Sequence, residues 1–220
     1  MIGTNLDNIR KELPKHVELV AVSKTKPIED LQEAFDAGQR IFGENKVQEM
    51  ASKYEVLPKE IQWHFIGHLQ RNKVKYLAPF VSLIHGVESF RLLKEINKQA
   101  LKSNRIIDVL LQFYIADEET KFGLSEEEAN DLLNSEEFKL LHNIQIRGVM
   151  GMATFTKDQE KIRGEFQKLK NIQNSLKAKH FSDNDLFDVV SMGMSGDYTT
   201  AIDEGSTMIR IGSSIFGARN

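Results

Sequence analysis

Residues 17–27 read Val17-Glu18-Leu19-Val20-Ala21-Val22-Ser23-Lys24-Thr25-Lys26-Pro27. The apolar run in this segment predicts a buried β-strand, because short aliphatic runs bounded by turn signals are typical of strands inside a sheet. Pro27 then predicts the start of a helix, since its fixed φ suits the first helical turn and its missing N–H is not needed there. Lys24 is therefore expected at the carboxyl end of a strand, where α/β folds place their ligand sites.

The same order, a short apolar run followed by a longer amphipathic segment, repeats along the chain. Eight strands are expected, at residues 17–24, 39–43, 61–66, 81–85, 106–113, 144–150, 188–190 and 208–211. The helices expected between them include 27–37, 46–54, 89–102, one that Ser125 and Glu128 begin as a capping box, and one in which Ile162, Phe166, Leu169 and Leu176 share a face. Eight such units predict a (β/α)8 barrel of the TIM type in the α/β class. An open doubly wound sheet has the same alternation and is the alternative.

Composition is that of an ordinary globular domain. The chain has 220 residues, 28% of them charged, and a net charge of −3. No basic stripe stands out, so nucleic acid is not an expected partner, and no apolar run of about 18 residues predicts a membrane span. The N-terminus lacks the features of a signal peptide, and the absence of cysteine excludes disulfides and thiolate chemistry and fits a reducing compartment. We expect a single cytoplasmic domain over residues 1–220.

Lys24 is the residue of greatest chemical interest. An ammonium group tucked into the end of a barrel is costly to keep charged, so its pKa is expected to fall and the free amine becomes a nucleophile for carbonyl groups. This is the chemistry of a Schiff-base lysine. Taken alone, Lys24 favours the structural alternative, a side chain whose stem follows the strand end while its charge reaches solvent.

Two loops rich in glycine and serine follow the seventh and eighth expected strands. The first reads Ser191-Met192-Gly193-Met194-Ser195-Gly196-Asp197-Tyr198, and the second reads Gly212-Ser213-Ser214-Ile215-Phe216-Gly217. The loops after strands seven and eight form the usual phosphate site of such barrels. Small residues let the backbone approach an anion, and helix N-terminal amides together with the Ser195 hydroxyl supply donors. With a strand-one lysine opposite, the loops predict a ligand that carries a phosphate at one end and a carbonyl at the other.

Other polar residues lie near the ends of expected strands. Arg210 interrupts the eighth strand, and its permanent charge requires an acceptor, either an internal carboxylate or a ring nitrogen or carboxylate of the ligand. Asn45 is either a turn residue or a ligand contact. His64 and His68 are four apart, but a strand that runs into a glycine turn does not bring both rings to one ion, so no metal site is expected. His68 can still face the pocket, and Met152 is either core filler or part of a ligand wall.

Five motifs resemble one known family. They are Ala21-Val22-Ser23-Lys24-Thr25-Lys26-Pro27, Phe42-Gly43-Glu44-Asn45, Trp63-His64-Phe65-Ile66-Gly67-His68-Leu69-Gln70-Arg71-Asn72-Lys73, Ser191-Met192-Gly193-Met194-Ser195 and Arg210-Ile211-Gly212. In this order, over residues 21–217, the chain resembles the pyridoxal phosphate homeostasis protein family, whose members share the barrel domain of alanine racemase. The lysine heptapeptide and the segment that contains His64 and His68 are the most specific of the motifs.

The resemblance implies pyridoxal 5′-phosphate (PLP) as the cofactor, held as a Schiff base on Lys24. It also implies a set of pocket residues: Gly193, Ser195, Gly212 and Ser213 around the phosphate, Arg210 at the pyridine nitrogen, Asn45, His68 and Met152 along the wall, and Ser191 and Met194 beside them. The sequence departs from the family pattern at Gly151, where a bulkier or hydroxylated residue is expected.

Arginine at the ring nitrogen predicts little or no turnover. A cation there disfavours protonation of the nitrogen and weakens the ring as an electron sink. Racemases with this feature add a tyrosine from a second domain and the partner subunit, whereas all four tyrosines of this chain, Tyr54, Tyr76, Tyr114 and Tyr198, lie inside the expected barrel. The expected function is to hold PLP and to buffer or deliver it in vitamin B6 homeostasis, with at most a weak side activity on amino acids and no catalytic residue.

Two enzymes are the alternatives. One is a single-domain PLP-dependent amino-acid racemase or related enzyme, which needs a second proton donor such as His68 or Tyr198. The other is a Schiff-base aldolase of sugar phosphates that uses Lys24 without a cofactor. The expected partners are PLP and apo-forms of PLP-dependent enzymes. A monomer is expected because the second domain of the racemase, which supplies one of its dimer contacts, is not expected in this chain.

Overall fold

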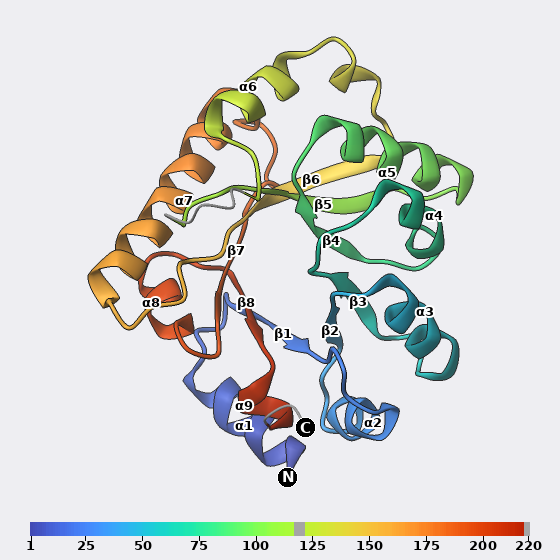
Figure 1. Ribbon diagram of the computed structural model, residues 1–220, viewed down its shortest axis with the longest axis vertical. Helices are drawn as coiled ribbons and strands as arrows, with labels where there is room; N and C mark the ends of the chain where they lie inside the picture. The colour runs from blue at the N-terminus through green and yellow to red at the C-terminus, as the bar shows by residue number, and fades with distance from the viewer. Residues whose placement is uncertain (117–121, 218–220) are drawn as a thin grey trace.

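Eight parallel strands form a closed barrel in sequence order, and the last strand pairs with the first. The computed structural model describes residues 1–116 and 122–217. The strands are β1 (Glu18–Val22), β2 (Ile41–Glu44), β3 (Gln62–Phe65), β4 (Leu83–Val87), β5 (Ile107–Gln112), β6 (Ile144–Met150), β7 (Val189–Met194) and β8 (Met208–Ile211). Figure 1 shows the helices arranged around this ring. The predicted (β/α)8 barrel is confirmed, and the open doubly wound alternative is wrong.

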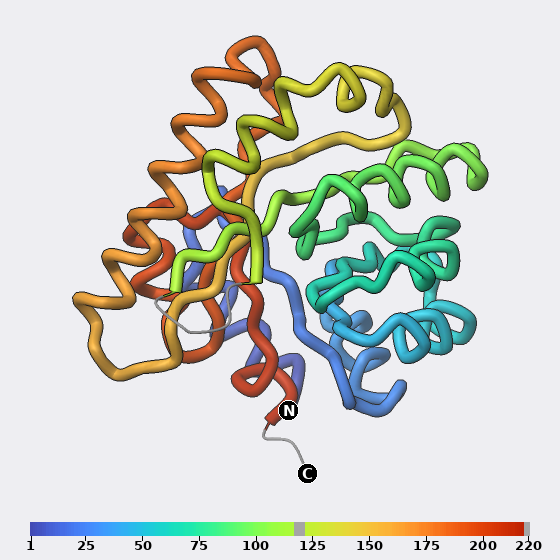
Figure 2. The backbone as a smooth tube through the Cα atoms, turned by 45° about the horizontal axis from the view of Figure 1, so that its top comes forward, coloured from blue at the N-terminus to red at the C-terminus, as the bar shows by residue number. Residues whose placement is uncertain are grey.

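The helices follow the strands as the alternation predicts. They are α2 (Ile28–Asp36), α3 (Val47–Val56), α4 (Val74–Leu77), α5 (Phe90–Lys102), α6 (Glu126–Asn134), α7 (Gln159–His180), α8 (Tyr198–Asp203) and α9 (Ser213–Phe216), with 3-10 turns η1 (Arg71–Lys73) and η2 (Phe138–Leu140). The capping box of Ser125 and Glu128 is confirmed at the start of α6. Figure 2 shows α7, the long orange helix, running along one side of the barrel. Its predicted apolar face is buried, at Ile162, Phe166, Leu169 and Leu176.

The short helices α4 and α9 were not predicted, and α9 lies in the segment 212–217 that was expected to be a loop. The longer helix α1 (Ile2–Glu12) was not predicted either. The buried residues of α1, Ile2, Leu6 and Ile9, have helical spacing, which is the signal that could have found it. The Asn5 side-chain amide donates to the Ile215 carbonyl at 2.9 Å, and in Figure 1 α1 lies beside α9 at the foot of the barrel. The two ends of the described chain therefore meet, and α1 supports the segment that follows β8.

The barrel interior changes from apolar to polar along the strands. Val20, Leu83, Leu110, Met150 and Met208 form one buried cluster. Side chains two residues apart share a strand face, so the polar side chains that lie two positions further on point into the same interior. These are His85 after Leu83, Arg210 after Met208 and Ser191 after Val189, and all three are buried. An apolar plug thus supports a polar layer at the carboxyl ends of the strands.

Several strand ends differ from prediction by one or two residues, and two differences bear on the site. β7 runs to Met194 rather than to residue 190, because Gly193 adopts a positive φ of 96° and the pairing with β8 shifts register between Ser191 and Met194. Residues 191–194 are therefore strand and not loop. β1 ends at Val22, so Lys24 lies two residues beyond the strand and not at its last position.

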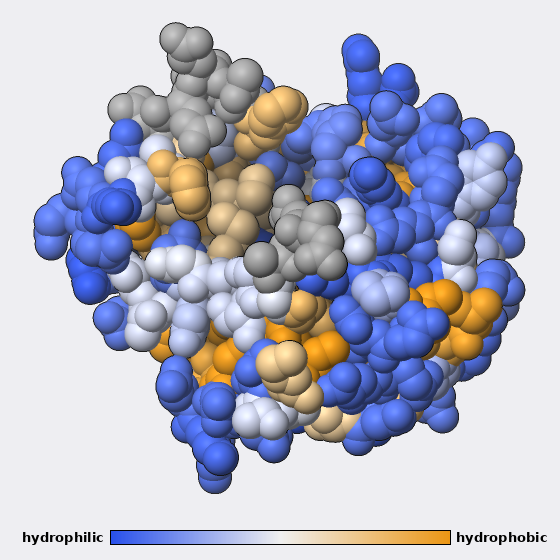
Figure 3. Space-filling model, turned by 60° about the horizontal axis from the view of Figure 1, so that its bottom comes forward, coloured by the Kyte–Doolittle hydropathy of each residue, from blue (hydrophilic) through white to orange (hydrophobic). Residues whose placement is uncertain are grey.

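Surface character agrees with a globular domain. The face drawn in Figure 3 is mainly hydrophilic, and its apolar side chains form limited patches. Within residues 1–116 and 122–217, none of the helices has both the length and the apolar character that crossing a bilayer requires.

Candidate functional site

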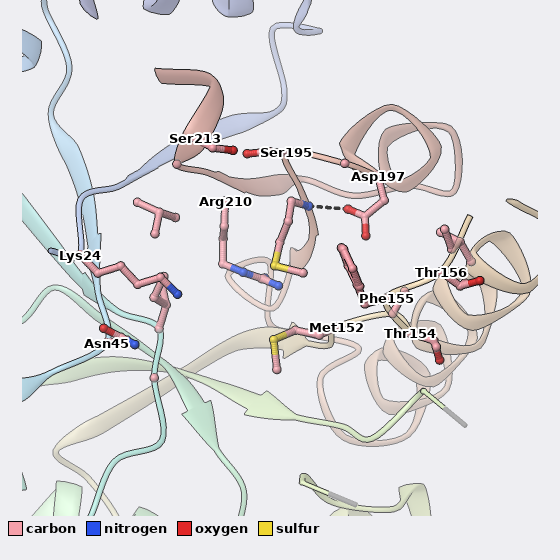
Figure 4. Close-up of a pocket in the computed structure, with 18 of the residues that line it drawn as sticks. Lys24, Asn45, Met152, Thr154, Phe155, Thr156, Ser195, Asp197, Arg210 and Ser213 are labelled. Carbon is pink, nitrogen blue, oxygen red and sulfur yellow. Dashed lines mark hydrogen bonds between the residues drawn. The ribbon is translucent and has the colours of Figure 1, made fainter. Parts of the chain in front are cut away.

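A cavity of about 540 Å³ opens at the carboxyl ends of the strands. This volume suits a cofactor-sized molecule. Eight of the residues predicted for the site line it: Lys24, Asn45, Met152, Met194, Ser195, Arg210, Gly212 and Ser213. The lining also includes residues that the sequence interpretation missed, among them Lys26, Thr154, Phe155, Thr156 and Asp197. Figure 4 shows the Lys24 and Arg210 side chains extending among the other residues that line the cavity.

Lys24 is presented by a tight turn. The Lys26 amide donates to the Ser23 carbonyl at 3.1 Å and closes the turn. Thr25 takes a positive φ of 64°, an unusual conformation for a β-branched residue. Such a conformation persists only where surrounding contacts enforce it. The direction of the half-buried Lys24 side chain therefore depends on the contacts that hold this turn, and not on the strand alone.

The enforcing contacts come from a buried ion cluster on β2 and α3. The Lys53 ammonium donates to Glu44 Oε1 at 2.8 Å, to Glu49 Oε1 at 2.7 Å and to the Ser23 carbonyl at 2.9 Å. The Ser23 hydroxyl donates to Glu44 Oε1 at 2.7 Å, and the Thr25 amide donates to Glu49 Oε1 at 2.5 Å. Ser23 and Thr25, which flank Lys24, are thus both hydrogen-bonded to members of this ion cluster. Burial raises the pKa of the Glu44 carboxyl, while Lys53 and the Ser23 hydroxyl act in the opposite direction.

Small polar residues after β7 and β8, Ser195, Gly196 and Ser213, line the same cavity as Lys24. The Ser195 and Ser213 hydroxyls point toward one another in Figure 4. No described residue accepts a hydrogen bond from the backbone N–H groups of Ser195 and Gly196. Asp197 Oδ1 accepts from the Met194 amide at 2.6 Å and fixes the turn between β7 and α8. Burial raises the pKa of Asp197, and the Met194 amide and the Arg210 cation oppose that shift.

The two glycines near these serines have different physical roles. A Cβ atom on Gly212 would lie 3.1 Å from the Val22 carbonyl oxygen, so glycine lets the start of α9 approach β1. A Cβ atom on Gly193 would lie 2.7 Å from the Cβ atom of Ala201, and its φ is positive. Gly193 therefore allows α8 to pack on β7, and the structure places it outside the lining of the cavity.

Arg210 is buried, with an exposure of 4%. Its Nη1 donates to the carbonyl and the hydroxyl of Ser191 at 2.9 and 2.6 Å, and its Nη2 donates to the Gly151 carbonyl at 3.2 Å. The internal carboxylate that the sequence left open as a partner is not among these acceptors, which are neutral oxygens. Burial lowers the pKa of Arg210 to about 10, with the Asp197 carboxylate opposing. Arg210 thus remains a cation at neutral pH.

The remaining predicted residues divide between the cavity and its surroundings. Asn45 lines the cavity, and its buried Oδ1 accepts no hydrogen bond from the described residues. Met152 is 43% exposed, which makes it part of the wall and not core filler. His68 lies outside the lining, where its Nδ1 contacts Glu88 Oε1 at 2.9 Å. Ser191 lies behind the lining, beneath Arg210.

Two buried histidines predict how stability depends on pH. His64 and His85 are in contact inside the barrel. Burial lowers the pKa of His64 to about 3 and that of His85 well below its ordinary value. Because the unfolded chain takes up these protons below about pH 6.5 and the folded protein does not, the free energy of unfolding should fall as pH drops from 6.5 toward 3. The slope is about 1.4 kcal/mol per pH unit for each histidine.

Urea unfolding at pH 7, 6 and 5 checks this prediction. Glu44, whose raised pKa acts in the opposite direction, is common to all variants and cancels in a comparison. His64→Asn, which keeps an acceptor near the Nδ1 position but does not titrate, should flatten the slope by about 1.4 kcal/mol per unit. The control His142→Asn changes an exposed histidine and should leave the slope as it is. Equal slopes in all three proteins would contradict the prediction.

Fold and cavity together define an alanine racemase-type barrel, in which a lysine after β1 and small residues after β7 and β8 line one cavity. The family model for the alanine racemase N-terminal domain matches residues 1–220. The chain belongs to this family, and within it to the group of the pyridoxal phosphate homeostasis proteins. The relative of that name from Aquifex aeolicus (strain VF5) is 40% identical over 204 residues, which are 92% of this chain and 87% of the relative. The one from Vibrio alginolyticus is 41% identical over 212 residues, 94% and 88% of the two chains.

Solved structures agree with this placement. PipY of Synechococcus elongatus PCC7942, solved without PLP, superposes with a TM-score of 0.91 at 33% identity, covering 99% of this chain and all of that one. The form of PipY with PLP bound gives 0.88 at 32% identity. Alanine racemase of Clostridium difficile 630 gives 0.78 at 14% identity, over 99% of this chain and 56% of that chain, which is a likeness of fold alone.

Proposed function

We propose that this protein binds PLP in the cavity, holds it as a Schiff base on Lys24, and serves PLP homeostasis by buffering or delivering the cofactor. The observation that carries the proposal is that Lys24, the hydroxyl-bearing Ser195 and Ser213, and the buried Arg210 line one cavity. The relatives named for PLP homeostasis and the PLP-bound form of PipY support it.

The residues present fit such a cofactor at each of its polar ends. Ser195, Gly196 and Ser213 offer hydroxyl and amide donors to a phosphate. Arg210 has two N–H donors, out of five, from which none of the described residues accepts a hydrogen bond. The buried Oδ1 of Asn45 could accept a hydrogen bond from the ligand. It has no donor among the described residues, and a buried acceptor without a donor is unfavourable. The Lys24 amine can condense with an aldehyde, forming a C=N bond with loss of one water molecule.

The electrostatics favour a carrier over an enzyme. When bound, PLP supplies an electron sink only as far as its ring nitrogen is protonated. Arg210, a buried cation, disfavours a second positive charge beside it. Among the described lining residues, those that titrate or carry charge are Lys24, Lys26, Asp197 and Arg210, and none is a tyrosine or histidine. Neither His68 nor Tyr198, the candidate proton donors of a racemase, lines the cavity; the Tyr198 hydroxyl donates to Glu12 at 3.1 Å instead.

Titration of the purified protein with PLP tests the proposal. A visible absorption band that borohydride bleaches, together with a reduced PLP adduct on the peptide that contains Lys24, is expected. Exchange of the α-hydrogen of amino acids with solvent deuterium should stay at background. Exchange well above background would replace the carrier with an amino-acid enzyme. A colourless protein that takes up no PLP would remove both, and trapping of a sugar phosphate by borohydride would then favour the cofactor-free aldolase.

The proposal further describes the protein as a single domain that is monomeric and cytoplasmic. In this role it transfers PLP to apo-forms of PLP-dependent enzymes. The single barrel and the family match over residues 1–220 support one domain, and the absence of cysteine fits a reducing compartment. Sedimentation of the protein alone and with an apo-enzyme tests both the monomer and the hand-over complex.

A further inference from the structure

Four buried polar residues form one hydrogen-bonded chain across the barrel, from β8 through β7 and β4 to β3. Arg210 Nη1 donates to Ser191 Oγ at 2.6 Å. His85 Nδ1 lies 3.0 Å from Ser191 Oγ, and His85 Nε2 lies 3.1 Å from His64 Nδ1. All four residues have an exposure of 4% or less. Of the four, Arg210 alone lines the cavity.

The chain has one direction of donation. Arginine only donates, so Ser191 Oγ accepts from Arg210 and its own proton is free for the neighbouring acceptor. That acceptor is His85 Nδ1, because a second bond accepted by Ser191 would leave the buried hydroxyl proton unpaired. His85 then carries its proton on Nε2 and donates to His64 Nδ1. Both rings are neutral, in line with the lowered pKa of each.

This arrangement constrains Arg210 without neutralising it. A buried arginine is commonly paired with a carboxylate, which would balance its positive charge. Here the Ser191 and Gly151 oxygens accept hydrogen bonds from three of its five N–H groups. These oxygens are neutral, so they do not balance the charge. His85 fixes the hydroxyl that receives the shortest of these bonds. The guanidinium is therefore held in one orientation, and within the described part of the chain its other two N–H donors have no acceptor.

We propose that Ser191, His85 and His64 are positioning residues that hold Arg210 with its free donors toward the ring nitrogen of bound PLP. The inference rests on the proposed function. His85 and His64 act through Arg210, since neither lines the cavity. Replacing His85 or His64 should thus reduce only the part of the PLP affinity that comes from the hydrogen bond between Arg210 and the ring nitrogen.

Equilibrium binding of two ligands tests this role. One is PLP, and the other is 1-deazapyridoxal 5′-phosphate, in which a C–H group replaces the ring nitrogen. His85→Phe should weaken the binding of PLP by roughly tenfold or more, the size of one hydrogen bond to a charged group. It should leave the affinity for the deaza analogue unchanged. His64→Leu should act in the same direction, and His64→Asn, which keeps the acceptor for His85, should restore PLP binding.

The controls separate the possible failures. His142→Phe changes an exposed ring and should alter neither affinity. If His85→Phe does not fold, Ser191→Ala removes one hydroxyl and carries the same test. Equal losses for PLP and the analogue, or no loss for either in a folded variant, would overturn the positioning role while the proposed function stands. Wild-type protein that binds neither compound would overturn the proposed function and this inference with it.

Discussion

Lys24→Ala is expected to abolish the borohydride-reducible absorption band that PLP gives with the wild-type protein. The reason is chemical, because alanine has no amine to condense with the aldehyde, so bound PLP keeps its carbonyl. The substitution leaves unchanged Ser195 and Ser213, the residues proposed to bind the phosphate in the same cavity. Residual binding should therefore be reversible and removable by dialysis. Absorption spectra before and after borohydride, with mass measurement of the reduced protein, check the result.

Lys26 provides a matched control for this experiment. It lines the same cavity two residues away, but its ammonium donates to the carbonyls of Phe216 and Gly217 at 3.0 and 3.2 Å. Lys26→Ala should therefore keep the reducible band. If Lys24→Ala kept the band and Lys26→Ala lost it, the Schiff base would belong to Lys26. That result would refute the proposed role of Lys24.

Lys53→Met should lower the free energy of unfolding by about 3–5 kcal/mol near neutral pH, the usual effect of removing one partner of a buried ion pair. Lys53 and Glu44 have side-chain exposures of 5% and 0%, so water replaces the lost contact poorly. The buried Oε2 of Glu44 already accepts no hydrogen bond from the described residues. The variant should also bind PLP more weakly, because the turn that presents Lys24 loses its link to Ser23. Urea unfolding and PLP titration measure the two effects.

Two further variants make the prediction specific. Lys53→Met combined with Glu44→Gln should recover most of the lost stability, because no uncompensated charge then remains buried. Lys94→Met breaks an exposed pair with Glu137 and should change stability by no more than about 0.5 kcal/mol. Lowering the pH should reduce the loss in the single variant, since Glu44, with its pKa raised by burial, takes up a proton in the folded state. A single variant no less stable than Lys94→Met would refute the role of the cluster.

Much of the fold was accessible from local patterns. Residues 144–150 and 208–211 were predicted as strands with the bounds that the structure has. Their aliphatic runs end at turn residues, and such signals act within a few neighbours along the chain. β7 was predicted too short because Ser191 and Gly193 interrupt its apolar pattern, and the pairing with β8 keeps them in the sheet nevertheless.

The site divides in the same way. The sequence by itself determined that a lysine follows the first strand, that small-residue loops follow the last two, and that an arginine interrupts β8, since each is a statement about one segment. Only the tertiary structure decided that Arg210 is held by neutral oxygens, that Lys53 clamps the turn of Lys24, and that His64 meets His85. Those partners come from different strands and helices, and contacts between them depend on strand register and barrel closure, which no single segment encodes.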